Sequence, residues 1–298
     1  MSRALYFAGA EYPLKIQIHA NPILGAKLFM THTVVLLRHG ESDSNASGRF
    51  IGWDDVALTA QGILEAREAG LTLLKEGLQD FDAVYCSYLK RSIKTAWIVA
   101  ETLNRCYVPV LCRWQLNEQM YGALQGLSKR TIDDKYGSET VHTWRRSYDI
   151  PPPAAPGADS YFPKNDRKYV GLTDADAPET WSTPGTESLR DAQARVWNLW
   201  ATEIGPAILA GQRILVVAHN NVLRALLQKL DTIEITALKQ LSVPRAIPLV
   251  YELDSYLKPS PVLGHNKPLS GRFLGSPALV ERRLALDIAA ARLPEQIA

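Results

Sequence analysis

Short apolar runs alternate with segments of helical periodicity along the chain from residue 33 onward. The runs are too short to be helices, so they predict buried strands. These strands are expected at residues 34–37, 83–86, 108–111, 214–218 and 249–253. Pro109 limits the third to an edge or an end of a sheet, because proline has no N–H to donate to a neighbouring strand.

Apolar residues between these runs recur with the spacing of helices. The helices predicted from this spacing cover residues 59–77, 89–103, 188–204, 221–230, 233–241 and 279–292. Thr59 is the expected N-cap of the first helix, and Gly77 is expected to end it. The alternation of strands and helices predicts an α/β fold, a three-layer α/β/α sandwich with a mostly parallel central sheet.

Two parts of the chain lack this rhythm. Residues 147–187 are rich in proline and carry no apolar periodicity, which predicts either a disordered segment or a lid. Residues 1–29 precede Met30, a candidate start, and charged residues interrupt any apolar stretch in them. We therefore expect an N-terminal appendage at 1–29, a core domain at 30–275 and a helical tail at 276–298.

Charge and composition exclude some classes of function. The 33 basic and 31 acidic residues give a net charge of +2, which argues against a polybasic protein that binds nucleic acid. No uncharged apolar run approaches the ~18 residues of a membrane-spanning helix. The three cysteines form no C-x-x-C pair and no even set, which suits a reducing compartment and predicts a cytoplasmic protein.

Polar residues follow the predicted strands at their carboxyl ends, where parallel sheets bind ligands. His39 follows the first strand, His219 follows the fourth, and Arg91 lies just beyond the second. If these strands are neighbours, imidazoles and guanidiniums meet at one place. Arginine suits phosphate oxygens, and histidine can carry a phosphoryl group as a nucleophile.

The alternatives are structural histidines or a metal site, and surrounding arginines make a cation site poor. The other histidines are expected on the surface: His19, His32, His142 and His265.

Several motifs together carry a family resemblance. Arg38-His39-Gly40-Glu41-Ser42 with Asn45, Lys90-Arg91 and Leu116-Asn117-Glu118 with Tyr121-Gly122 resemble the histidine phosphatase superfamily. Trp144-Arg145-Arg146, Thr186-Glu187-Ser188-Leu189, Ala218-His219 with Asn221 and Leu223-Arg224, and the run at 246–252 resemble its 2,3-bisphosphoglycerate-dependent phosphoglycerate mutases. The resemblance spans about Met30 to Gly275 in chain order.

The resemblance implies a phosphoglycerate mutase-like catalytic domain that interconverts 3-phosphoglycerate and 2-phosphoglycerate in glycolysis and gluconeogenesis. His39 is the expected phosphorylated nucleophile, primed by 2,3-bisphosphoglycerate and without a metal. Arg38, Arg91 and His219 are expected to surround the transferred group, and Glu118 is the expected general acid/base. The expected substrate-binding set is Arg38, Asn45, Ile51, Gly52, Arg91, Glu118, Tyr121, Lys129, Arg145, Arg146, Asn220 and Asn221. The implied partners are small phosphoglycerates, with no nucleic acid or membrane, and the implied assembly is a homodimer or homotetramer.

The chain differs from the family pattern at three sites, which involve four residues. Gln119-Met120 stand where Arg-His is usual, Asn220 stands in place of a glycine, and Ile51 stands in place of a serine or threonine. They leave two alternatives open, a phosphatase acting on another small phosphate ester and a non-catalytic phosphometabolite-binding homologue. A mutase must also exclude water from its phosphohistidine, and residues 147–187 and the C-terminal tail are the expected lid.

Overall fold

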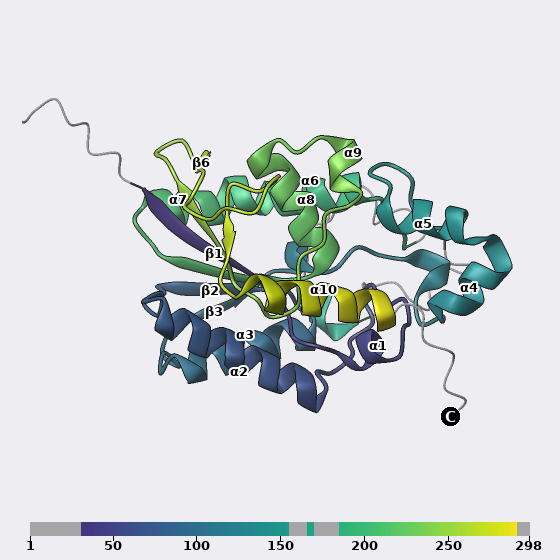
Figure 1. Cartoon of the computed structure of the whole chain (residues 1–298), viewed down its shortest axis with the longest axis horizontal. Helices are drawn as coiled ribbons and strands as arrows, with labels where there is room; N and C mark the ends of the chain where they lie inside the picture. Colours follow the sequence, from purple (N-terminus) through teal and green to yellow (C-terminus); the bar gives the residue numbers. More distant parts are fainter. Residues whose placement is uncertain (1–30, 155–165, 170–184, 291–298) are drawn as a thin grey trace, which may run out of the picture. The chain divides into compact units, whose positions relative to one another are not determined.

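The computed structural model describes residues 31–154, 166–169 and 185–290 (Figure 1). Its strands form one sheet in the order β3-β2-β4-β1-β5-β6, with β7 also paired to β5. They are β1 (His32–Arg38), β2 (Ala83–Cys86), β3 (Val110–Cys112), β4 (Ile214–Ala218), β5 (Leu249–Leu253), β6 (Pro259–Ser260) and β7 (Arg272–Phe273). Strands β3, β2, β4 and β1 are parallel, whereas β5 is antiparallel to β1. The predicted sandwich with a mostly parallel sheet is confirmed.

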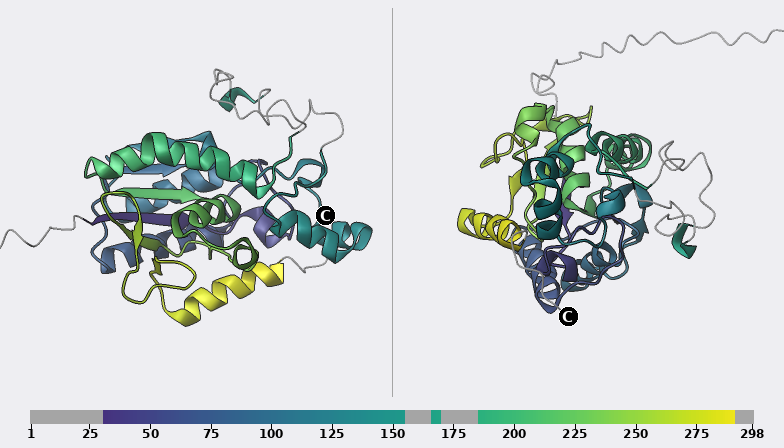
Figure 2. Two further views of the ribbon diagram at one scale, coloured as in Figure 1. Left: turned by 90° about the horizontal axis from the view of Figure 1, so that it is seen from above. Right: turned by 90° about the vertical axis from the view of Figure 1, so that its right-hand side faces the viewer.

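Helices cover both faces of the sheet (Figures 1 and 2). Val35 and Leu37 of β1 pack in a cluster with α2 (Ala60–Lys75) and α3 (Lys90–Thr102). Val34 and Leu36 pack on the opposite face against α6 (Leu189–Leu199) and α8 (Asn220–Asp231). Because both faces are buried, the four central residues of β1, 34–37, are all apolar, and this explains the continuous run in the sequence.

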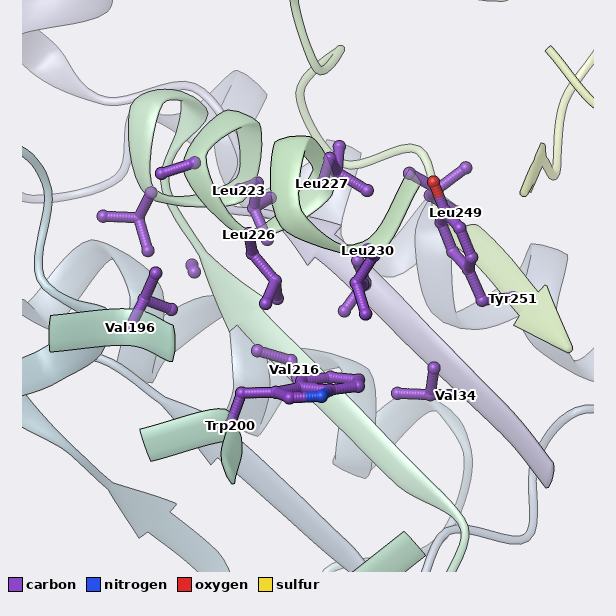
Figure 3. Packing of buried hydrophobic residues seen from close by; sticks show 14 of the residues in the cluster. Val34, Val196, Trp200, Val216, Leu223, Leu226, Leu227, Leu230, Leu249 and Tyr251 are labelled. Atoms are coloured by element: carbon purple, nitrogen blue, oxygen red, sulfur yellow. The ribbon is translucent and has the colours of Figure 1, made fainter. Parts of the chain in front are cut away.

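The cluster beneath α8 is built around a buried tryptophan. Figure 3 shows the indole of Trp200 among Val34 and Val216 of the sheet and Leu226 and Leu230 of α8. Trp200 begins a widened π-helical turn, η7 (Trp200–Ile204), that continues directly into α7 (Gly205–Leu209). The predicted end at residue 204 is therefore wrong, because the helical run continues to Leu209 although Pro206 has no N–H to donate.

Most of the remaining elements are short, and most of them lie around the polar end of the sheet. They are α1 (Asp43–Ala46), η2 (Trp114–Leu116), η3 (Gly122–Leu124), α4 (Lys129–Tyr136), α5 (Ser138–Arg146), η5 (Arg167–Tyr169), α9 (Ile235–Leu238) and α10 (Pro277–Ala290). Thr59 caps α2 by accepting a hydrogen bond from the Gly62 N–H. Strand β3 begins two residues later than predicted but lies at the sheet edge, and α9 covers only part of 233–241.

Helix α10 is anchored to the core by charge. The buried guanidinium of Arg283 donates to Glu65, which is fully buried, and to Glu68 at 2.6 Å. Figure 1 shows α10 beside α1, at the polar end of the sheet. The expected appendage at 1–29 and most of the expected lid at 147–187 lie outside the described residues, so these remain predictions. Within the described residues, no helix is long and apolar enough to cross a membrane.

Candidate active site

The topology brings the polar strand ends together. Strand β4 lies between β2 and β1, so His219, Ser87 and His39 all emerge at the same edge. The His39 N–H donates to the Ala218 carbonyl at 3.1 Å, and the His39 and His219 rings lie 4.8 Å apart between centroids. Strands β2, β4 and β1 therefore lie side by side. The prediction that these side chains meet depended on this arrangement.

A cleft of about 840 Å³ opens at this edge. It is lined by every predicted site residue except His219: Arg38, His39, Asn45, Ile51, Gly52, Arg91, Glu118, Tyr121, Lys129, Arg145, Arg146, Asn220 and Asn221. Further lining cations are Arg49, Lys239 and Lys267, while the lining carboxylates are Glu118, Asp133 and Asp287. Cations outnumber carboxylates, so the cleft favours a small molecule with several negative charges.

His39 is held in one tautomer. Its Nδ1 lies 2.7 Å from the Gly40 carbonyl oxygen, which only accepts hydrogen bonds. In the neutral ring the proton therefore resides on Nδ1, and Nε2 keeps its lone pair. Burial, followed by the charges of Arg91 and Arg38, lowers the pKa of His39 well below its usual value. The imidazole is neutral at neutral pH, with a free nitrogen suited to nucleophilic attack.

Backbone carbonyls orient the two arginines beside His39. Arg91 donates to the Gly52 and Asp54 carbonyls at 2.9 and 2.8 Å, and Arg38 donates to the Val243 carbonyl at 2.8 Å. Gly52 has φ of +54°, and a Cβ there would lie 2.2 Å from the Gln125 side chain, so only glycine fits. Burial lowers the pKa of Arg91 to about 10, which leaves it charged at neutral pH.

His219 lies behind His39. Its Nε2 lies 2.8 Å from the Ser87 hydroxyl oxygen, and its buried Nδ1 has no hydrogen-bond partner among the described residues. Burial and the nearby Arg91 charge lower the pKa of His219 well below its usual value. A buried nitrogen without a partner is costly, so the ring suits a ligand atom that completes its hydrogen bonding.

Glu118 sits on a loop held by a buried ion pair. Arg195 donates to the Asn117 and Glu118 carbonyls at 2.7 and 3.0 Å and pairs with Glu187 at 2.8 Å. Both charged side chains of this pair are only 2% exposed. Burial raises the pKa of Glu118, while the Gln119 N–H that its carboxylate accepts opposes this shift. A carboxylate held in place with a raised pKa is suited to moving a proton.

A second group of cations lines the part of the cleft formed by α4 and α5. Lys129 begins α4, and burial together with the Arg145 charge lowers its pKa to about 7. Arg146 donates to the Ser242 hydroxyl at 3.1 Å. Arg145 and Arg146 are both half-buried and line the cleft, so they are not a solvated surface pair.

The comparisons with known proteins agree with this geometry. The family model of the histidine phosphatase superfamily (branch 1) matches residues 34–162 and 163–256. The chain belongs to this superfamily. It is 45% identical over 252 residues to a 2,3-bisphosphoglycerate-dependent phosphoglycerate mutase of Nitratidesulfovibrio vulgaris, covering 85% of this chain and 95% of that protein. It is 47% identical over 227 residues to a protein of the same name from Nitrosococcus oceani, covering 76% and 92%. The resemblance inferred from the motifs is confirmed.

Solved structures share the fold at lower identity. Bacillus stearothermophilus YhfR matches with a TM-score of 0.57 at 21% identity, covering 76% of this chain and 93% of that one. A structure named mycobacterial hydrolase 1 matches with a TM-score of 0.55 at 24% identity, covering 77% and 95%. These likenesses establish the architecture.

The three departures from the family pattern are accommodated locally. Asn220 is the first residue of α8 and has no positive φ, so the position needs no glycine for its backbone. Its side-chain oxygen accepts the Val243 N–H at 3.0 Å. Gln119 is buried and donates to the Glu187 carbonyl at 2.6 Å, whereas Ile51 lines the cleft. Gln119 is therefore part of the support beneath Glu118.

Some site residues have no signal in the sequence. Asp287 of α10 reaches the cleft and pairs with Arg38 at 2.6 Å and with Arg245 at 3.3 Å. A lone aspartate in a terminal helix gives no hint of this. His142 of α5 is exposed, as predicted, and it also lines the cleft. His32 and His265 are half-buried and do not line the cleft, and His19 lies outside the described residues. The described residues contain no cluster of three or more side chains able to hold a metal ion.

Proposed function

We propose that this protein interconverts 3-phosphoglycerate and 2-phosphoglycerate, a step of glycolysis and gluconeogenesis, through a phosphohistidine at His39. The observation that carries the proposal is the fixed tautomer of His39, which leaves Nε2 free in a residue that lines a cleft rich in cations. The curated relatives at 45% and 47% identity bear the name of this activity.

The distribution of cations suits a molecule with two anionic ends. Arg38 and Arg91 lie beside the nucleophile, and Lys129, Arg145 and Arg146 come from α4 and α5. A phosphoglycerate carries a phosphate and a carboxylate, so one group can lie at each set. The same cations suit 2,3-bisphosphoglycerate, which supplies the phosphoryl group that first charges His39.

In the proposed reaction, His39 transfers a phosphoryl group between itself and the substrate hydroxyl. Arg38, Arg91 and His219 stabilise the charge on the transferring oxygens, and Asn45 also lines the cleft. Glu118 takes the proton from the attacking hydroxyl and returns it in the reverse step. Its raised pKa brings its proton affinity closer to neutrality, as general acid/base work requires.

The proposal also includes the remaining substrate-binding residues, the location of the protein, its assembly and its cover against water. Tyr121 and Asn221 are hydrogen-bonded to each other at 2.7 Å and shape the substrate side of the cleft with Gly52, Ile51 and Asn220. The glycolytic role places the protein in the cytoplasm, and a homodimer or homotetramer is the expected assembly. Helix α10 contributes Leu284, Asp287 and Ile288 to the cleft wall and is the candidate cover against water.

A phosphorus NMR time course tests the proposal. The protein is incubated with 3-phosphoglycerate and a trace of 2,3-bisphosphoglycerate, and a growing 2-phosphoglycerate signal with little free phosphate is expected. His39→Ala should lower the rate by about 10³-fold or more. His265→Ala, which alters a half-buried histidine that does not line the cleft, should leave the rate unchanged. Growth of free phosphate in place of 2-phosphoglycerate would identify a phosphatase and overturn the proposal.

A further inference from the structure

Two of the three cysteines face each other across neighbouring strands. Cys86 ends β2, Cys112 ends β3, and the two residues are direct partners in the parallel register. Their sulfur atoms lie 3.6 Å apart, and both thiols are free. Adjacent strands lie ~4.8 Å apart, which is within the range of Cα separations that disulfides span. A disulfide between them requires the sulfurs to approach to about 2.05 Å, which takes an adjustment of the two strand ends.

The two thiols differ in exposure and in proton affinity. Cys86 is fully buried, whereas Cys112 is half-buried on the edge strand. The hydrogen bond between the two sulfurs lowers the pKa of Cys112 to about 7, and the charge of the adjacent Arg113 contributes further. The same hydrogen bond and burial raise the pKa of Cys86. Cys112 is thus a thiolate for much of the time near neutral pH, with a protonated thiol beside it.

We propose that Cys86 and Cys112 form a redox modification site at which hydrogen peroxide oxidises Cys112 and Cys86 then closes a disulfide. In the first step the Cys112 thiolate attacks the peroxide, the O–O bond breaks, and a sulfenic acid and hydroxide form. Hydroxide takes the Cys86 proton as water, and the Cys86 sulfur attacks the Cys112 sulfur. The second hydroxide leaves and becomes water by taking up a proton. Two thiols are oxidised by two electrons, and one peroxide is reduced to two waters.

The site is linked to the catalytic edge by the chain itself. Cys86 is followed by Ser87, whose hydroxyl lies 2.8 Å from the His219 Nε2. The Cys86 carbonyl also accepts the Arg113 N–H at 2.8 Å, which couples both strand ends. Drawing the sulfurs together by about 1.5 Å shifts the end of β2, and with it Ser87 and the ring of His219. Oxidation should therefore lower turnover, a part of the inference that rests on the proposed function.

Cysteine mapping tests the site without any activity measurement. Cys106 is exposed and shares a tryptic peptide with Cys112, so the experiment uses a Cys106→Ser background. Hydrogen peroxide should lower the intact mass by about 2 Da and link peptide 76–90 to peptide 106–113. An added Cys86→Ser change should instead give a mass gain of about 16 or 32 Da at Cys112. If the linked peptide is absent while Cys112 stays a thiol, the site is overturned.

Turnover of the same oxidised protein tests the link to His219. The kcat should fall by at least about tenfold, because ångström displacements of catalytic groups cost rates of this order or more. Dithiothreitol should restore it, and the variant that also carries Cys112→Ser should show no reversible loss. An unchanged kcat in fully linked protein would overturn the coupling. A reduced protein with no activity would refute the proposed function and leave the peptide mapping unaffected.

Discussion

The contact between Asp287 and Arg38 predicts a specific change in anion binding. Arg38 is one of the cations beside His39, yet one of its nitrogens lies 2.6 Å from the Asp287 carboxylate. A phosphate that binds Arg38 shares this guanidinium with the carboxylate, whose negative charge opposes the binding of another anion. Asp287→Asn keeps the size of the side chain and removes its charge, so the variant should bind phosphate-like anions more tightly than the natural protein.

The structure sets the magnitude of this effect. A hydrogen bond to a charged group contributes about 1.5–3 kcal/mol. The side chains of this pair are 9% and 19% exposed, so solvent screens part of the attraction. A gain of about 1–2 kcal/mol is expected, which corresponds to about 5- to 30-fold tighter binding. Arg283 continues to anchor α10 on Glu65 and Glu68, so the helix should stay in place.

Titration with inorganic orthovanadate, followed by calorimetry, measures this affinity directly, and the KM for 3-phosphoglycerate should fall in parallel. Glu281→Gln is the matched control, because it removes one negative charge from an exposed position of the same helix. The gain should shrink in high salt, which screens the pair. Equal or weaker binding by Asp287→Asn, with Glu281→Gln unchanged, would refute the view that the charge of Asp287 opposes ligand binding.

Three further predictions concern charge and support around the cleft. The pKa of Lys129 is about 7, so its positive charge is present below this pH and is lost above it. The KM for 3-phosphoglycerate should therefore rise between pH 7 and 9 in initial-rate assays. Lys129→Arg should flatten this rise. Arg195→Ala leaves Glu187 buried without its partner and should lower the free energy of unfolding in urea by about 3–5 kcal/mol. Arg213→Ala, which breaks an exposed pair, should cost about 1 kcal/mol or less, and equal losses would contradict the argument. Asn220→Gly removes two side-chain hydrogen bonds, to Val243 and Asn221, and should destabilise by about 1–2 kcal/mol without lowering the KM. A lower KM would mean that Asn220 obstructs the substrate.

The pattern of apolar residues was sufficient to predict the bounds of some strands. Strand β4 and strand β5 have the predicted bounds, because every residue in them is apolar or sits between apolar neighbours with both flanks polar or turn-forming. The same pattern could not give strand direction, and β5 is antiparallel to β1. It also missed β6 and β7, which are two residues long and have no period to detect.

The sequence predicts those site residues that follow a strand or belong to a family motif. His39 and His219 follow buried strands, and parallel strands place their ends at one edge, so their meeting follows from the sheet order. The tautomer of His39 could not be predicted, because it depends on the position of one carbonyl oxygen at 2.7 Å. The support of Glu118 by Arg195 joins residues 77 positions apart, and only folding brings them together.

The amino-acid sequence by itself determined the layered α/β architecture, the strand ends that carry histidine, and membership of the histidine phosphatase superfamily. These properties follow from local periodicity and from short motifs, and both can be read directly from the order of residues. Only the tertiary structure decided that Asp287 faces Arg38 and that Cys86 lies beside Cys112. Both contacts depend on how separate elements pack against one sheet, and packing is a property of the whole fold, whereas periodicity belongs to a single segment.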